Sequence, residues 1–84
     1  MQELDKLRYL KDKCRWSATG DNEVMIARYH LKKMEWGEAV QYLERAIRKG
    51  TLSNRDKTYQ LLADTYDCLG LENLALETRL KLTS

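Results

Sequence analysis

The 84-residue chain is 43% hydrophobic and 33% charged, and its formal net charge is +2. These proportions are typical of one folded domain and exclude an intrinsically disordered chain. The net charge is too small to predict a nucleic-acid or membrane partner, because such binding needs many clustered cations. No apolar run approaches the ~20 residues of a membrane-spanning helix or the ~7 of a signal-peptide core, so we expect a cytoplasmic protein.

Residue usage favours helices. Proline is absent and glycine occurs only four times, while the dominant residues (Leu, Ala, Glu, Lys and Arg) lose little side-chain entropy in a helix. We therefore expect an all-α fold. Cys14 and Cys68 lack the spacing of a metal site or a disulfide framework, so we expect both to be reduced, with a single crosslink between them as the alternative.

Apolar residues recur at helical spacing in five segments, two of which precede residue 35. The first, residues 2–16, combines an apolar stripe with a basic opposite face, and polar residues then interrupt the pattern. The second covers residues 22–34, with Asp21 placed as its N-cap. The two apolar stripes consist of Leu4, Leu7, Leu10 and Cys14, and of Val24, Ala27, Leu31 and Met34.

The third segment, residues 36–49, has the most regular pattern. Its apolar residues follow the i, i+3, i+4, i+7 spacing of an amphipathic helix. Two cations in the last turn and Gly50 directly after it predict a well-capped C-terminus. The stripe consists of Trp36, Ala39, Val40, Leu43, Ala46 and Ile47.

Two further helices complete the chain. Ser53 and Asp56 resemble a weak capping box at the start of the fourth, which Gly70 ends, and the fifth starts near Leu71. Because the connections are short, consecutive helices should be antiparallel and form a stack of hairpins. The inner stripes consist of Tyr59, Leu62, Ala63, Tyr66 and Leu69 in the fourth helix and of Leu74, Ala75, Thr78 and Leu82 in the fifth.

The chain also contains an internal repeat. A shift of 36 residues places small residues on small ones and large residues on large ones, as helix packing requires. A repeat of this length is typical of an α-solenoid. The matching pairs are Ile26 with Leu62, Ala27 with Ala63, His30 with Tyr66, Ala39 with Ala75, and Val40 with Leu76.

These residues resemble the tetratricopeptide-repeat (TPR) family. Its pattern is carried in the second repeat by Tyr59, Leu62, Ala63, Tyr66, Gly70 and Ala75, and in the first by Ile26, Ala27, Trp36, Ala39, Leu43 and Ala46. The resemblance implies a short right-handed α-solenoid of about five helices in a single domain, residues 1–84. That domain would hold an extra helix (1–16), repeat one (22–50) and repeat two (53–83). The chain departs from the pattern at Glu23, Met34, Thr51 and Arg79, where the family has a large residue, a turn glycine, a proline and an aromatic residue.

The resemblance further implies a concave groove lined by the first helix of each pair. Residues of the fourth helix that face away from its inner stripe are therefore candidates for binding a partner: Lys57, Gln60, Asp64 and Asp67. The candidates in the second helix are counterparts one repeat earlier: Val24, Arg28, Leu31 and Lys32. Their mixture of cations, anions and apolar groups suits a peptide or helix with charges and a hydrophobic anchor. For any single residue, an ordinary solvated helix face is the alternative.

The fifth helix has a second apolar stripe, formed by Leu76 and Leu80. A helix that is apolar on two faces needs two neighbours. We expect a further helix, a partner protein or a second copy of the chain to cover this stripe, because solenoids need their ends covered. Self-association through the C-terminal helix is thus one expectation.

Catalytic chemistry is not expected. His30 is the only histidine, it takes the packed position equivalent to Tyr66, and no Ser or Cys nucleophile can be paired with it from spacing. Phosphate loops, Cys-x-x-Cys pairs and His-Glu-x-x-His motifs are missing from the sequence. We therefore expect no enzyme, no metal or cofactor, and no small-molecule substrate.

The sequence favours a scaffold or adaptor that binds a protein or peptide partner. One alternative is an RNA-binding pentatricopeptide-like repeat, because Thr58-Tyr59 and a Leu-Gly turn also resemble that family, with Gln60 near its base-reading position. Interleaved acids such as Asp64 oppose nucleic-acid binding. Another alternative is a dimerisation or regulatory fragment of a larger protein.

Overall fold

The computed structural model describes residues 8, 9, 11 and 19–82. Over these residues it has four helices and no strand, which confirms the all-α prediction: α2 (Asp21–Lys32), α3 (Trp36–Lys49), α4 (Arg55–Cys68) and α5 (Glu72–Leu80). The helix expected over residues 2–16 lies largely outside the described residues, as does Cys14 with its possible crosslink.

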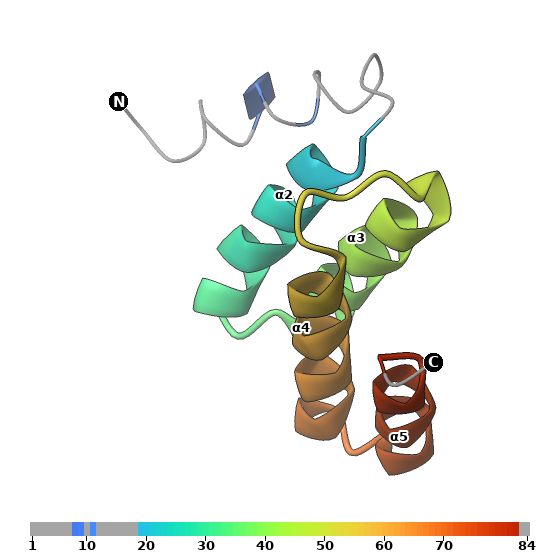
Figure 1. Cartoon of the computed structure of the whole chain (residues 1–84). Coiled ribbons are helices and arrows are strands. Elements are labelled where there is room, and N and C mark those ends of the chain that lie inside the picture. Colours follow the sequence, from blue (N-terminus) through green and yellow to red (C-terminus); the bar gives the residue numbers. More distant parts are fainter. Residues whose placement is uncertain (1–7, 10, 12–18, 83–84) are drawn as a thin grey trace.

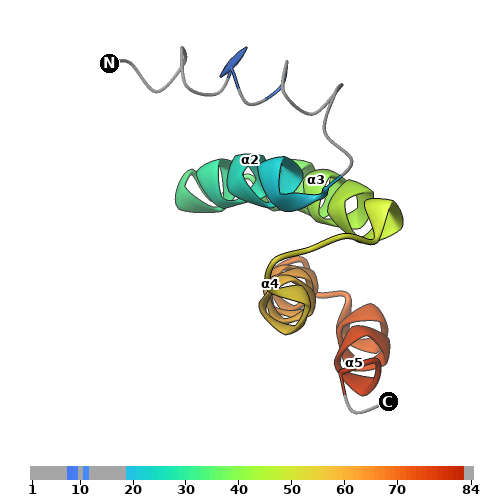
Figure 2. The ribbon, with the colours of Figure 1, turned by 45° about the horizontal axis from the view of Figure 1, so that its top comes forward.

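Consecutive helices pack against each other in chain order. α2 contacts α3, α3 contacts α4, and α4 contacts α5. The pairs α2/α3 and α4/α5 are antiparallel hairpins (Figure 1). In Figure 2, α4 and α5 are seen nearly end-on while α2 and α3 lie across the view, so the second hairpin is rotated relative to the first. None of the helices described is long and apolar enough to cross a membrane.

Small residues form the seam between the helices. Ala27, Ala39 and Ala75 are fully buried and belong to one core cluster with Leu43, Leu62 and Tyr66. An alanine at a helix crossing lets two backbones approach, and the larger neighbours fill the remaining space. The inner stripes predicted for α3 and α4 are confirmed at these positions.

Three of the described threonines are buried, and the apolar pattern predicts only one of them, Thr78, to face the core. Thr58, Thr65 and Thr78 are almost fully buried. Each hydroxyl donates to the backbone carbonyl four residues earlier, at distances of 3.0, 2.6 and 2.7 Å. A hydroxyl satisfied in this way can face the core, so these residues pack as small apolar groups would.

The N-cap predicted at Asp21 is wrong, and so is the capping box at Ser53. Asp21 is the first residue of α2, and its carboxylate accepts hydrogen bonds from the Ser53 backbone N (2.9 Å) and Oγ (2.5 Å). These bonds hold the pKa of Asp21 below its ordinary value. Ser53 therefore points to α2, and Asn54 caps α4 instead by accepting from Lys57 N at 3.1 Å.

The turn between α2 and α3 comes two residues earlier than predicted. α2 ends at Lys32, and Met34 has a positive φ of 60° at the position where the TPR pattern has glycine. This left-handed backbone cannot continue a helix. Met34 is 73% exposed rather than part of the inner stripe. By contrast, α3 has the predicted bounds, and Gly50 follows it in the left-handed conformation, as expected.

Gly20 is the glycine that lies closest to a neighbouring backbone. Its N donates to Thr51 O at 2.8 Å, and a Cβ at this residue would lie 2.5 Å from Ala46 O. The start of α2 is thus pressed against the end of α3 and the loop that follows it.

We expect Gly20→Ala to lower the free energy of unfolding by about 1–3 kcal/mol, because the new methyl group would push the backbone of α3 away. Urea denaturation measures this change. The matched control is Gly37→Ala, where nothing lies within 4 Å of the added Cβ. Equal effects of the two substitutions would contradict the close approach at Gly20.

Candidate protein-binding surfaces

The clearest exposed apolar surface lies on α5. The side chains of Leu76 and Leu80 are each 58% exposed and lie one turn apart on the same face; we call this pair the α5 leucine face. The exposed positions agree with the second stripe predicted for this helix. Leu69, Leu71 and Leu74 are also exposed, so the assignment of Leu69 and Leu74 to the inner stripes of α4 and α5 is wrong.

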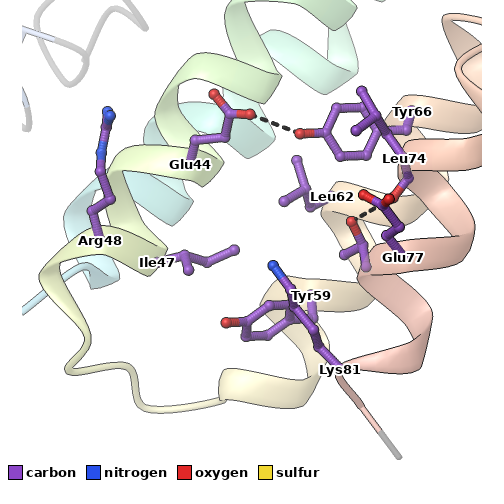
Figure 3. Close-up of a pocket in the computed structure, with 10 residues that line it drawn as sticks. Glu44, Ile47, Arg48, Tyr59, Leu62, Tyr66, Leu74, Glu77 and Lys81 are labelled. Atoms are coloured by element: carbon purple, nitrogen blue, oxygen red, sulfur yellow. Dashed lines mark hydrogen bonds between the residues drawn. The ribbon is translucent and has the colours of Figure 1, made fainter.

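A second candidate surface is a cleft between α3, α4 and α5, with a volume of about 360 Å³. Figure 3 shows Ile47 and Leu62 at its centre, with Tyr59 and Tyr66 at its two ends. Charged side chains of both signs border this apolar floor. The lining residues are Glu44, Ile47, Arg48, Tyr59, Leu62, Tyr66, Leu74, Glu77, Thr78 and Lys81.

At one end of the cleft, a hydrogen bond joins α3 to α4. The Tyr66 hydroxyl donates to Glu44 Oε2 at 2.7 Å (Figure 3). Burial of the phenol, together with the neighbouring carboxylate, raises the pKa of Tyr66 to about 12. The residue combines an apolar ring in the core with a hydroxyl that fixes how α4 crosses α3.

The eight groove candidates do not line this cleft. On α2, Arg28 and Lys32 are exposed, whereas Val24 and Leu31 are half-buried, and Leu31 packs against the core. On α4, Lys57 and Gln60 are exposed. Their role as a concave binding groove stays a prediction.

Asp64 and Asp67 are engaged within the second hairpin. Arg79 of α5 donates to Asp64 Oδ1 at 3.1 Å and to Asp67 Oδ2 at 2.5 Å. The two carboxylates raise the pKa of the Arg79 guanidinium. Arg79, which stands where the TPR pattern has an aromatic residue, therefore joins α5 to α4 through charge instead of a buried ring.

Glu23, another departure from the TPR pattern, forms a buried ion pair. Its side chain is 4% exposed and contacts Lys49 Nζ at 2.5 Å, so the start of α2 is tied to the last turn of α3. Sequence analysis missed this pair because the partners are 26 positions apart (49 minus 23) on different helices. The sequence does contain one sign of this pair, because Glu23 stands where the TPR pattern has a large residue.

His30 is buried, as its equivalence to Tyr66 predicts. Its ring stacks on Tyr42 with centroids 5.6 Å apart and meets Tyr29 edge-on. Nδ1 lies 2.8 Å from Glu35 Oε1, which joins the end of α2 to the residue before α3. These contacts give His30 a structural position at the α2–α3 turn. Across the described residues, His, Cys, Asp and Glu form no group of three that could hold a metal.

Comparison of the chain with protein-family models, with curated proteins and with solved structures gives no match. The TPR resemblance therefore stays a prediction based on the chain's own residues.

We expect Lys49→Met to lower the free energy of unfolding by about 2–4 kcal/mol, because it leaves the Glu23 carboxylate buried without its cation. The double variant Glu23→Leu, Lys49→Met should recover most of this loss, since two apolar side chains need no ion pair. Urea denaturation of Lys49→Met, of Glu23→Leu, of the double variant and of the exposed-site control Lys57→Met measures the coupling. Additive effects of the two substitutions would contradict a buried pair.

The Tyr66 phenol should ionise at about pH 12, well above an ordinary tyrosine, in a spectrophotometric titration. Since folding raises this pKa, the associated stability is present below about pH 10 and is lost as the pH rises through about 12. Glu44→Gln should shift the ionisation toward lower pH by removing the carboxylate. An unchanged titration would show that the Glu44 hydrogen bond has no part in the shift.

Proposed function

We propose that this chain is a TPR-type protein-interaction module, a scaffold or adaptor that binds a helix or peptide of a partner protein through the α5 leucine face. The observation that carries the proposal is the exposure of Leu76 and Leu80 on the last helix described, opposite the face that α5 packs against α4. Exposing the two leucines to water costs free energy, and burying them against an apolar partner would be favourable.

The arrangement of the helices supports this function. Two antiparallel hairpins with fully buried alanines at matching positions, Ala39 and Ala75, are consistent with a repeat array. The positive φ at Met34 falls at the turn position where the TPR pattern has glycine. Arrays of this type bind partners along exposed helix faces rather than through catalytic groups.

The polar surroundings of the α5 leucine face favour binding of a specific partner over non-specific hydrophobic association. Glu72 lies one turn before Leu76 on the same face, and Glu77 lies one turn before Leu80. Both carboxylates are on exposed residues. An apolar centre with a charged border is the usual design of a reversible protein-binding site.

We expect the double substitution Leu76→Lys, Leu80→Lys to weaken partner binding at least about ten-fold, because it removes the apolar anchors. Partners crosslinked to the wild-type chain would be identified and purified, and each titrated against both chains by calorimetry.

The control is Met25→Lys, Met34→Lys, which makes the same type of change at two exposed apolar residues of the first hairpin. It should leave binding unchanged. Equal affinity of the wild-type chain and the α5 variant for every partner, or an equal loss in the control, would refute the proposal.

A further inference from the structure

The internal repeat relates the α5 leucine face to a surface that is already occupied in the first hairpin. The shift of 36 residues pairs Val40 with Leu76 and position 44 with position 80. It also pairs Ala39 with Ala75, which are both fully buried, so α3 and α5 lie in the same rotational setting within their hairpins. The α5 leucine face is thus the counterpart of the α3 face that includes Val40 and Glu44.

In the first hairpin, α4 contacts that face at Glu44. Val40 is half-buried against the core, and Glu44 accepts the hydrogen bond from Tyr66 at 2.7 Å. Nearer the end of α3, Ile47 lines the same cleft as Tyr59, which lies early in α4. α4 therefore crosses α3 obliquely and in the opposite chain direction, with Tyr66 at Glu44 near the middle of α3 and Tyr59 in the cleft with Ile47 (Figure 3).

We infer that the α5 leucine face docks an amphipathic helix of a partner protein in the way that α3 docks α4, with an apolar side chain at the position of Tyr66. This inference rests on the proposed function and specifies its ligand. Leu80 replaces Glu44 in the repeat and offers no acceptor for a hydroxyl. A phenol buried there would lose its hydrogen bond to water, whereas a phenyl ring or a leucine would not.

The charges on α5 define the other end of the ligand. An antiparallel helix would pass Leu80, then Leu76, then Glu72, each one turn apart. Glu72 takes the position of the half-buried Trp36 on α3. A Lys or Arg in the last turn of the docked helix would therefore face a carboxylate, and would also suit the negative C-terminal end of its own helix.

The length of α5 argues against a second copy of the chain as the occupant. The helix has nine residues, so it is only about 14 Å long. A symmetric contact through Leu76 and Leu80 alone would bury far less than the roughly 800 Å² per partner of a stable interface. A longer partner helix can continue past both ends of α5.

The test uses two peptides built on α4. Both contain residues 54–69 followed by Ala-Ala-Ala-Lys, with Cys68→Ser to prevent crosslinking and a Gln60→Lys side chain joined to Asp64 as a lactam to hold the helix. One keeps Tyr66 and the other has Tyr66→Phe. Fluorescence anisotropy measures their binding to the full chain up to about 1 mM.

We expect the Tyr66→Phe peptide to bind the wild-type chain about five-fold more tightly than the Tyr66 peptide. In the chain variant Leu80→Glu, which restores the acceptor found at Glu44, the order of the two affinities should reverse. In the Leu76→Lys, Leu80→Lys chain, binding of both should be lost. Circular dichroism melts would check that each variant folds as the wild-type chain does.

Several results would overturn the inference. A preference of the wild-type chain for the Tyr66 peptide would mean that the peptide displaces α4 from α3. Equal affinities of the two peptides, or no binding at the highest concentration, would contradict the inferred ligand. Sedimentation showing a dimer that Leu76→Lys, Leu80→Lys dissociates would assign the face to a second copy. Loss of a purified partner in that variant, without any peptide preference, would leave the proposed function standing and reject only this ligand.

Discussion

Close approach of helix backbones at alanine positions is the constraint on which the rest of the structure depends. Ala27, Ala39, Ala63 and Ala75 are fully buried, and each occupies a crossing where a larger side chain would separate the helices. Larger residues then fit between them, with Leu43 and Leu62 in the same cluster. Because one pattern recurs in both hairpins, the two hairpins have comparable surfaces. A difference at one repeated position, such as Glu44 against Leu80, therefore indicates a difference in what each surface can bind.

Polar contacts fix how the helices meet once the alanines have brought them together. The start of α2 is held at three residues within about one turn: by Gly20 to the loop after α3, by Asp21 to Ser53, and by Glu23 to Lys49. Between the hairpins, Tyr66 and Glu44 perform the same task. These bonds are directional, so they select one crossing among those that apolar packing would tolerate.

The sequence predicts the features that depend on local periodicity. The bounds of α3 and the glycine after it follow from six apolar residues at regular spacing, and the burial of His30 follows from its equivalence to Tyr66. What could not be predicted depends on partners distant in the chain. Nothing near Asp21 indicates that Ser53 occupies its carboxylate, and the cleft combines residues of three helices that no periodic pattern connects. Met34 misled the pattern because an apolar side chain usually marks a core position, while here its backbone makes the turn.

The order of contacts along the chain has a consequence for motion. Each described helix packs on its neighbours in sequence, so α5 is held mainly by α4, with Ala75 and Thr78 buried and Arg79 paired at the surface. Local opening of this last helix should cost less free energy than opening of α3, which is held on both sides. A ligand seated on α5 would therefore suppress fraying at this end of the molecule, and slower amide hydrogen exchange in α5 would report its presence even where no change of shape occurs.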